Sequence, residues 1–175
     1  MARIFVWNCN LPRLPSAWRE QLRDVGTYAS GALFTLGWWV FIDGLVMSRT
    51  LENSPVKFGF EDWIPGLLCT LGMIITNSID LTLLRDDGFG YSSGGGGLAG
   101  KAKLTLFIGI ALLAGGVAGS LAILAIKYIV PGVDASVLYI GFTNVIQTVC
   151  LLLASIVLWF VHNSEHDNNY NFVLN

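Results

Sequence analysis

The stretch GTYASGALFTLGWWVFIDGLVM, residues 26–47, decides the fold class because it contains no charged residue before Asp43. A helix needs about 20 mostly apolar residues to cross the hydrocarbon core of a bilayer, and this stretch supplies them. Three further stretches of the same kind follow, at about residues 62–84, 104–130 and 136–161. The sequence therefore predicts an all-α membrane protein with four transmembrane helices in one domain, residues 26–161.

Composition supports this class and excludes others. The chain has 175 residues, of which 54% are hydrophobic and 13% are charged, whereas a soluble domain has about 25% charged residues. The net charge of −2 gives no basic patch of the kind that nucleic-acid binding requires. Membrane lipids are therefore the expected surroundings, and nucleic acid is not an expected partner.

Two segments flank the predicted transmembrane domain. In residues 1–25, apolar positions recur at helical spacing from Ser16 to Val25, which predicts a short amphipathic helix lying in the membrane interface. The alternative is a solvated linker. Residues 162–175 form a polar tail in which Tyr170 to Val173 match a short tyrosine-based sorting signal. Trp18 and Trp63 are the expected aromatic anchors at the membrane surface.

The distribution of positive charge predicts the orientation of the helices. Four crossings place both termini on one side of the membrane, and cytosolic segments carry an excess of lysine and arginine. The terminal side would hold Arg3, Arg13, Arg19, Arg23, Arg85, Lys101 and Lys103, and the opposite side would hold Arg49, Lys57 and Lys127. Both termini are therefore predicted to be cytosolic.

Asp43 and Lys127 lie at the same predicted depth, near the lumenal ends of the first and third crossings. Charged groups inside a bilayer are costly and mark candidate sites. One interpretation is an Asp43–Lys127 ion pair, and the other is that each side chain reaches its own interface. Asp80 lies about 20 Å or more away in depth at 1.5 Å per residue, so the two aspartates cannot form a catalytic pair within one chain.

Uncharged polar residues are also expected inside the membrane. Asn77 lies near Asp80 at the cytosolic end of the second crossing, and Asn144 and Gln147 share a face nearer the bilayer centre. Such side chains form hydrogen bonds between helices, worth about 0.6 to 2 kcal/mol each. The alternative is a polar path for a solute.

Small residues recur at positions that would let helix backbones approach closely. The first crossing has Ser30, Gly37 and Gly44 at intervals of seven, and the third has Ala111, Gly115 and Gly119 at intervals of four. These seams predict close packing, either within the bundle or with a partner helix.

No motif predicts catalysis, a metal site or a cofactor. Residues 95–102 approach a phosphate-binding loop, but Ala102 stands where Ser or Thr would bind Mg²⁺, so a flexible loop is the expectation. His162 and His166 are four residues apart, yet they fall in the polar tail, where a solvated segment is favoured over a metal site.

Three segments resemble a known family. They are SGALFTLGWWVFIDGLVMSR (30–49), FEDWIPGLLCTLGMIITNSID (60–80) and LFIGIALLAGGVAGSLAILAIKYIV (106–130). Together they resemble the small four-span proteins of the transmembrane protein fifty family, and within it the fungal branch. The positions that match the family's motifs are Trp38, Asp43, Asp62, Trp63, Pro65, Asn77 and Asp80.

The resemblance implies a non-enzymatic protein of the late endosome and vacuole membrane, acting in protein sorting between them. It also implies a complex with another small four-span protein, similar to vacuolar protein sorting-associated protein fifty-five and to the endospanins of animals. The second hypothesis is transport of a small solute or binding of lipid, with Asn77, Asn144 and Gln147 lining a path. The two differ in whether Asn144 and Gln147 face neighbouring helices or a wet cavity.

Overall fold

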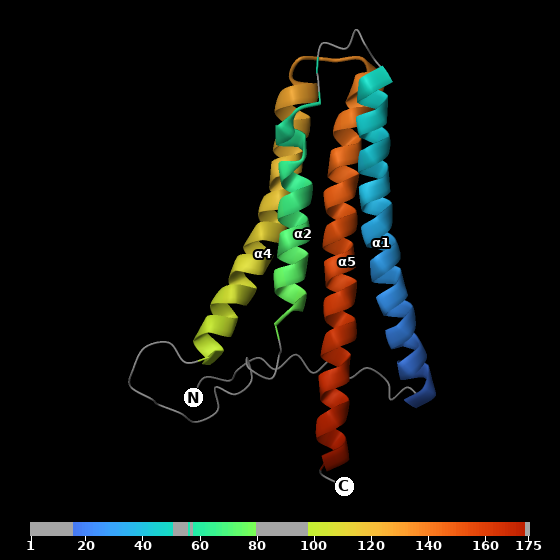
Figure 1. Ribbon diagram of the computed structural model, residues 1–175, viewed down its shortest axis with the longest axis vertical. Helices are drawn as coiled ribbons and strands as arrows, with labels where there is room; N and C mark the ends of the chain where they lie inside the picture. The colour runs from blue at the N-terminus through green and yellow to red at the C-terminus, as the bar shows by residue number, and fades with distance from the viewer. Residues whose placement is uncertain (1–15, 51–55, 57, 80–97, 174–175) are drawn as a thin grey trace, which may run out of the picture.

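In a computed structural model, the chain folds into a bundle of long helices (Figure 1). The structure describes residues 16–50, 56, 58–79 and 98–173, and for residues 16–20, 22, 98–99 and 163–173 it describes the backbone alone. Its elements are α1 (Ser16–Thr50), the 3₁₀ turn η1 (Phe60–Asp62), α2 (Ile64–Asn77), α4 (Leu98–Ile123), the π-helical segment η2 (Leu124–Ile129) and α5 (Ala135–Val173). These described ranges contain helices and no strand, which confirms the all-α prediction.

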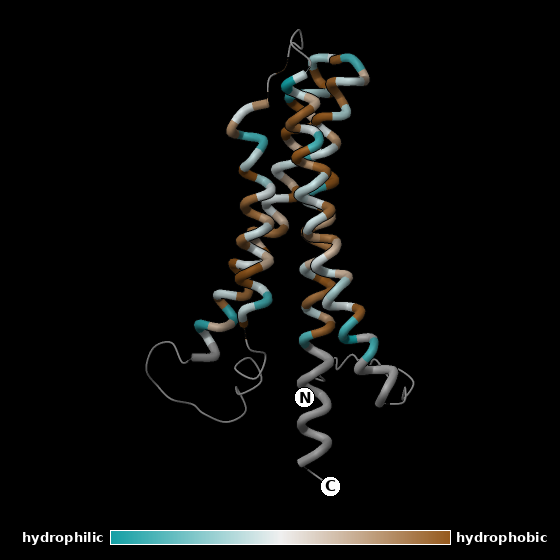
Figure 2. Tube along the Cα trace, turned by 45° about the vertical axis from the view of Figure 1, so that its right-hand side comes forward, coloured by the Kyte–Doolittle hydropathy of each residue, from teal (hydrophilic) through white to brown (hydrophobic). Residues whose placement is uncertain are grey.

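Three helices are long and apolar enough to cross a membrane: Arg23–Thr50, Gly100–Ile129 and Ala135–His162. Figure 2 shows hydrophobic residues along the length of the bundle and most hydrophilic residues towards its two ends. The side chains that point outward along these helices include many large apolar groups, as expected of a bundle surrounded by lipid rather than water.

The helices run up and down, so that α1 begins and α5 ends at the same end of the bundle (Figure 1). The end of α2 and the beginning of α4 lie towards that end as well. α1 packs mainly on α5, α2 packs mainly on α4, and α5 also contacts α2 and α4. α5 is therefore the helix that joins the two pairs.

The outer helices are longer than the sequence predicts. α1 is one helix of 35 residues, so the interfacial helix expected before residue 26 is not separate from the first crossing. Gly26 does not break the helix, because its bare backbone packs against Val161 of α5, where a Cβ would clash. α5 has 39 residues and continues to Val173, so the predicted polar tail is helical up to that residue.

α2 is shorter than the predicted crossing at 62–84. Pro65 lies in its first turn, where the missing N–H costs no hydrogen bond. The helix ends at Asn77, and Ser78 caps it by donating its backbone N–H to Ile74 and Ile75. Its 14 residues span about 21 Å, less than the ~30 Å of a hydrocarbon core. Asp80 lies outside the described residues.

The third crossing ends in a tight connection to α5. Val130 donates its N–H to the carbonyl of Ala125 at 2.9 Å, and Gly132 donates to Ile129 at 3.0 Å. Gly132 has φ 66°, a left-handed conformation that costs glycine little and other residues more. The chain reverses at Pro131-Gly132 and α5 begins at Ala135.

Candidate functional site

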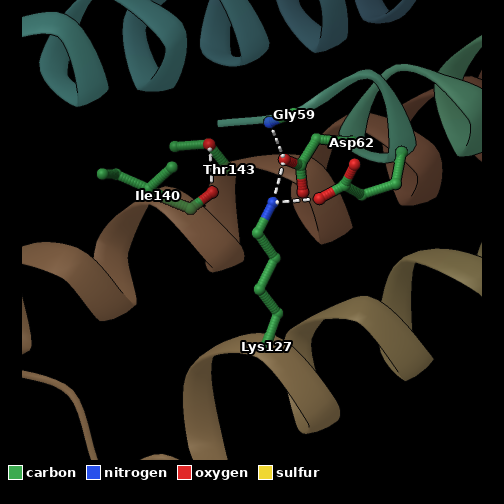
Figure 3. Close-up of polar contacts among 6 residues, drawn as sticks. Gly59, Asp62, Lys127, Ile140 and Thr143 are labelled. Atoms are coloured by element: carbon green, nitrogen blue, oxygen red, sulfur yellow. Dashed lines mark hydrogen bonds and ion pairs between the residues drawn. The ribbon is translucent and has the colours of Figure 1, made fainter. Parts of the chain in front are cut away.

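A cluster of charged side chains closes the end of the bundle where η1 meets η2 (Figure 3). Lys127 of η2 places its Nζ 2.5 Å from Asp62 Oδ2 and 2.9 Å from Glu61 Oε1. Asp62 is only 1% exposed, and its Oδ2 also accepts the backbone N–H of Gly59 at 2.8 Å. The lysine therefore neutralises a buried carboxylate and ties the start of α2 to the η2 segment that follows α4.

The predicted Asp43–Lys127 ion pair is wrong in its acidic partner. Asp43 is exposed on α1, and its Oδ2 accepts the hydroxyl of Tyr139 on α5 at 2.9 Å. Asp43, Asp62 and Lys127 all lie towards one end of the bundle, so depth alone does not separate the two aspartates. The two aspartates differ in which element they face. Asp62 of η1 faces Lys127, whereas Asp43 of α1 faces Tyr139 on α5.

The π-helical segment sets the direction of Lys127. Its hydrogen bonds span five residues instead of four, which locally inserts a residue and rotates the helix. Within it, Tyr128 is buried and packs against the backbone of α5 at Gly141, where a Cβ would lie 2.8 Å from the tyrosine ring. Lys127 then points to η1. Such segments occur frequently at functional sites.

Glu61 is the exposed member of the cluster. The hydrogen bond from the Lys127 ammonium group lowers the pKa of the Glu61 carboxyl below its ordinary value, and the positive charge of the same group adds to the effect. Glu61 is therefore ionised at neutral pH, and its pair with Lys127 persists to lower pH than an isolated glutamate would allow.

The small residues of α1 are used inside the bundle. Ser30, Gly37 and Gly44 are buried. A Cβ at Gly37 would lie 3.1 Å from Cys150 Cβ, and one at Gly44 would clash with Thr143. The small side chains of this seam let the backbones of α1 and α5 approach closely, which is how helices commonly associate in membranes.

A second seam joins α2 to α4 and was not predicted. A Cβ at Gly72 would lie 2.8 Å from the carbonyl oxygen of Gly109, and one at Gly116 would lie 2.8 Å from that of Pro65. The SH group of Cys69 donates to the Leu113 carbonyl at 3.6 Å across the same contact. The sequence signal was present as glycines seven apart, at positions 109 and 116.

Two residues of the predicted seam on the third crossing, Ala111 and Gly115, lie on a different side of the helix from these contacts, whereas Gly119 lies at their edge. Ala111 and Gly115 are exposed, and Gly115 has no atom of another element within 4 Å of its Cβ position. A Cβ at Gly119 would lie 3.8 Å from the Pro65 ring. We define the α4 outer face as the exposed small residues Ala111, Gly115, Ala118 and Ala122.

Polar side chains also line the inner face of α5. Ser120 of α4 and Thr148 of α5 form a buried hydroxyl pair at 2.8 Å, and Asn77 of α2 donates to Ser155 at 3.3 Å. Asn144 and Gln147 are 1% and 0% exposed. None of their four amide atoms has a hydrogen-bond partner among the described groups.

Of the predicted membrane-surface anchors and the predicted sorting signal, only the side chain of Trp63 is described by the structure. Trp18, Tyr170 and Val173 are described by their backbone alone. Trp63 is half-buried and contacts the rings of Trp38 and Phe41, so it packs inward as part of an aromatic cluster. Among the described residues, no three His, Cys, Asp or Glu side chains group as a metal site would need.

An all-helical bundle with three membrane-length helices, closely packed through small residues and bound at one end by a buried ion pair, defines a small helical membrane protein. The chain belongs to the uncharacterised protein family UPF0220, whose family model matches residues 3–168.

Three relatives support this assignment. Vacuolar protein sorting-associated protein 68 of Saccharomyces cerevisiae is 42% identical over 163 residues, covering 87% of this chain and 89% of the relative. The UPF0220 protein C8D2.02c of Schizosaccharomyces pombe is 38% identical, covering 87% and 88%. The transmembrane protein 50 homolog of Dictyostelium discoideum is 29% identical, covering 82% and 92%. No solved structure matches the chain.

Proposed function

We propose that this chain is a non-enzymatic membrane subunit that acts in protein sorting between the late endosome and the vacuole. The observation that carries the proposal is the 42% identity to vacuolar protein sorting-associated protein 68 over 87% of the chain. That coverage includes most of the bundle, so the relative has the length to form the same helices. The chain would lie in the endosomal or vacuolar membrane.

We further propose that the α4 outer face binds the helix of a partner, another small four-span membrane protein. Small residues at a helix surface favour close association of helices within lipid. The inward glycines of α4 already pack on α2, whereas Gly115 has no neighbour at its Cβ position. Large exposed apolar side chains, Phe107 and Ile126, lie before and after the small residues along the helix and could pack on the same partner.

In the proposed membrane arrangement, both ends of the chain face the cytosol, and α2 crosses the membrane in addition to the three longer helices. α2 is too short to span the hydrocarbon core by itself, and its contacts with α4 and α5 would hold it within the bundle. The loops that hold Glu61 and Pro131 would then face the lumen, and the Lys127 cluster would stabilise the lumenal end. Transport through the bundle is the less favoured hypothesis, because Asn144 and Gln147 are fully enclosed by protein.

Expression of this chain in Saccharomyces cerevisiae that lacks vacuolar protein sorting-associated protein 68 tests the sorting role. The secreted fraction of a soluble vacuolar hydrolase is measured with and without this chain, and we expect the chain to lower the secreted fraction to the level of cells that have the yeast protein. A matched control is the Gly115→Leu variant, which keeps the bundle intact but blocks the α4 outer face. Failure of the unmodified chain to restore sorting, although it reaches the endosomal membrane, would contradict the proposal.

A further inference from the structure

α2 ends well short of its neighbours at the end of the bundle where α1 begins and α5 ends (Figure 1). A hydrogen bond of 3.3 Å from Asn77 to Ser155 places the last residue of α2 beside position 155 of α5. From there α5 continues to His162, the last residue of its apolar, membrane-length segment. This continuation is about 10 Å long at 1.5 Å per residue.

α4 exceeds α2 by a similar length at the same end. Thr76 of α2 lies beside Gly109 of α4, since a Cβ at Gly109 would lie 2.5 Å from Thr76 Oγ1. The α4 helix extends beyond Gly109 as far as the exposed Lys103 and further, and the distance to Lys103 is about 9 Å along the axis. Leu104 of α4 and Phe160 of α5 are 61% and 62% exposed. Both neighbours therefore present large apolar side chains beyond the level at which α2 ends.

At the opposite end of the bundle, α2 begins level with its neighbours. The Lys127 cluster joins η1, just before α2, to η2, and Trp63 packs on Phe41 of α1 with 5.0 Å between their ring centroids. The shortfall in length is therefore confined to one end of α2. That end is polar, because Asn77 is its last residue and the exposed Ser78 caps it.

We propose that the cytosolic leaflet of the membrane is thinned beside α2, so that lipid headgroups and water reach the end of this helix. The inference rests on the proposed membrane arrangement, in which that end of α2 faces the cytosol. The last carbonyl groups of a helix lack partners within it, and hydrocarbon offers no donor to replace them, whereas water does. A bilayer accommodates a short apolar segment by thinning locally. This side of the protein therefore fits phospholipids with short or disordered acyl chains.

Fluorescence quenching in liposomes tests the thinning at two exposed positions of equal depth. Ser78 follows Asn77 directly, and Ile156, which is 42% exposed, directly follows the residue to which Asn77 donates. A fluorescent amino acid is placed at position 78 or 156 of the full chain. The phosphatidylcholine liposomes carry a nitroxide either on the headgroup or near the end of the acyl chain. We expect the headgroup nitroxide to quench position 78 about twofold more than the chain nitroxide does, and position 156 to show the reverse order.

Three other results would contradict the thinning, each for a different reason. Stronger quenching by the chain nitroxide at both positions would overturn it and leave the membrane arrangement in place. Stronger quenching by the headgroup nitroxide at both positions would overturn the membrane arrangement as well. Quenching of position 78 by aqueous iodide but by neither lipid would indicate a water-filled space within the protein instead of a thinned leaflet. The sorting role is measured separately, by the secreted hydrolase, so its failure is distinguishable from failure of the thinning.

Discussion

Replacing Lys127 with methionine is expected to lower the free energy of unfolding by about 3–5 kcal/mol, the cost of leaving one member of a buried ion pair without its partner. Asp62 is 1% exposed, and after the substitution its carboxylate would keep the N–H of Gly59 as a donor but no positive charge beside it. The midpoint of thermal unfolding in detergent should fall by about 10 °C, taking 2–4 °C per kcal/mol for a chain of this size. Tryptophan fluorescence can follow the transition, because Trp63 adjoins the cluster.

Matched variants identify which carboxylate pairs with Lys127. Asp62→Asn combined with Lys127→Met should recover most of the loss, since no buried charge then remains. Glu61→Gln should change the free energy of unfolding by less than about 1 kcal/mol, because Glu61 is exposed and surface pairs contribute little. Asp43→Asn should add independently to Lys127→Met. Rescue by Asp43→Asn instead of Asp62→Asn would contradict the observed pairing.

Leucine at two neighbouring glycines of α4 should have opposite effects. Gly116→Leu should destabilise the bundle by about 3 kcal/mol or more, because overpacking forces side chains and backbone apart. The new side chain would meet the Pro65 carbonyl, which already lies 2.8 Å from the Cβ position. Gly115→Leu should leave the isolated chain as stable or raise the free energy of unfolding by about 0.5–1 kcal/mol, since glycine weakens helices.

The two leucine variants also distinguish a loss of folding from a loss of partner binding. Gly115→Leu should reach the membrane in normal amounts and lose its partner during purification in mild detergent. Gly116→Leu should give little folded protein at all. Thermal unfolding measures the first property, and quantitative mass spectrometry of the co-purified proteins measures the second. If Gly115→Leu keeps its partner at full yield, the α4 outer face is not the binding surface.

Hydropathy alone predicts the helical class and a helix at each of α1, α2, α4 and α5, because an apolar run of about 20 residues most often forms a membrane helix. It does not predict where α2 ends. Apolar residues continue beyond Asn77, up to Leu84, whereas the observed end depends on Ser78, whose hydroxyl and backbone N–H both donate to the Ile74 carbonyl. It also misses the continuity of α1, since Gly26 is tolerated through its contact with α5.

The sites were harder to predict because they depend on which way each helix faces. Adjacent residues on a helix differ by about 100° in direction, so Gly115 and Gly116 belong to different surfaces although both look like seam residues. The sequence predicts that Lys127 forms an ion pair, but the π-helical turn that carries it and the η1 turn that meets it have no simple sequence signal. Asp62 lies just before Pro65 and at the right depth, and that placement could have identified it as a partner.

The proposal that a partner helix occupies the α4 outer face is tested most directly by photo-crosslinking in intact cells. A photoreactive amino acid is placed at position 111 or 115, and the control position is Leu36 of α1, which is 56% exposed. We expect one discrete cross-linked product, containing a small membrane protein, from positions 111 and 115 and not from position 36. Only lipid adducts at all three positions would contradict the proposal.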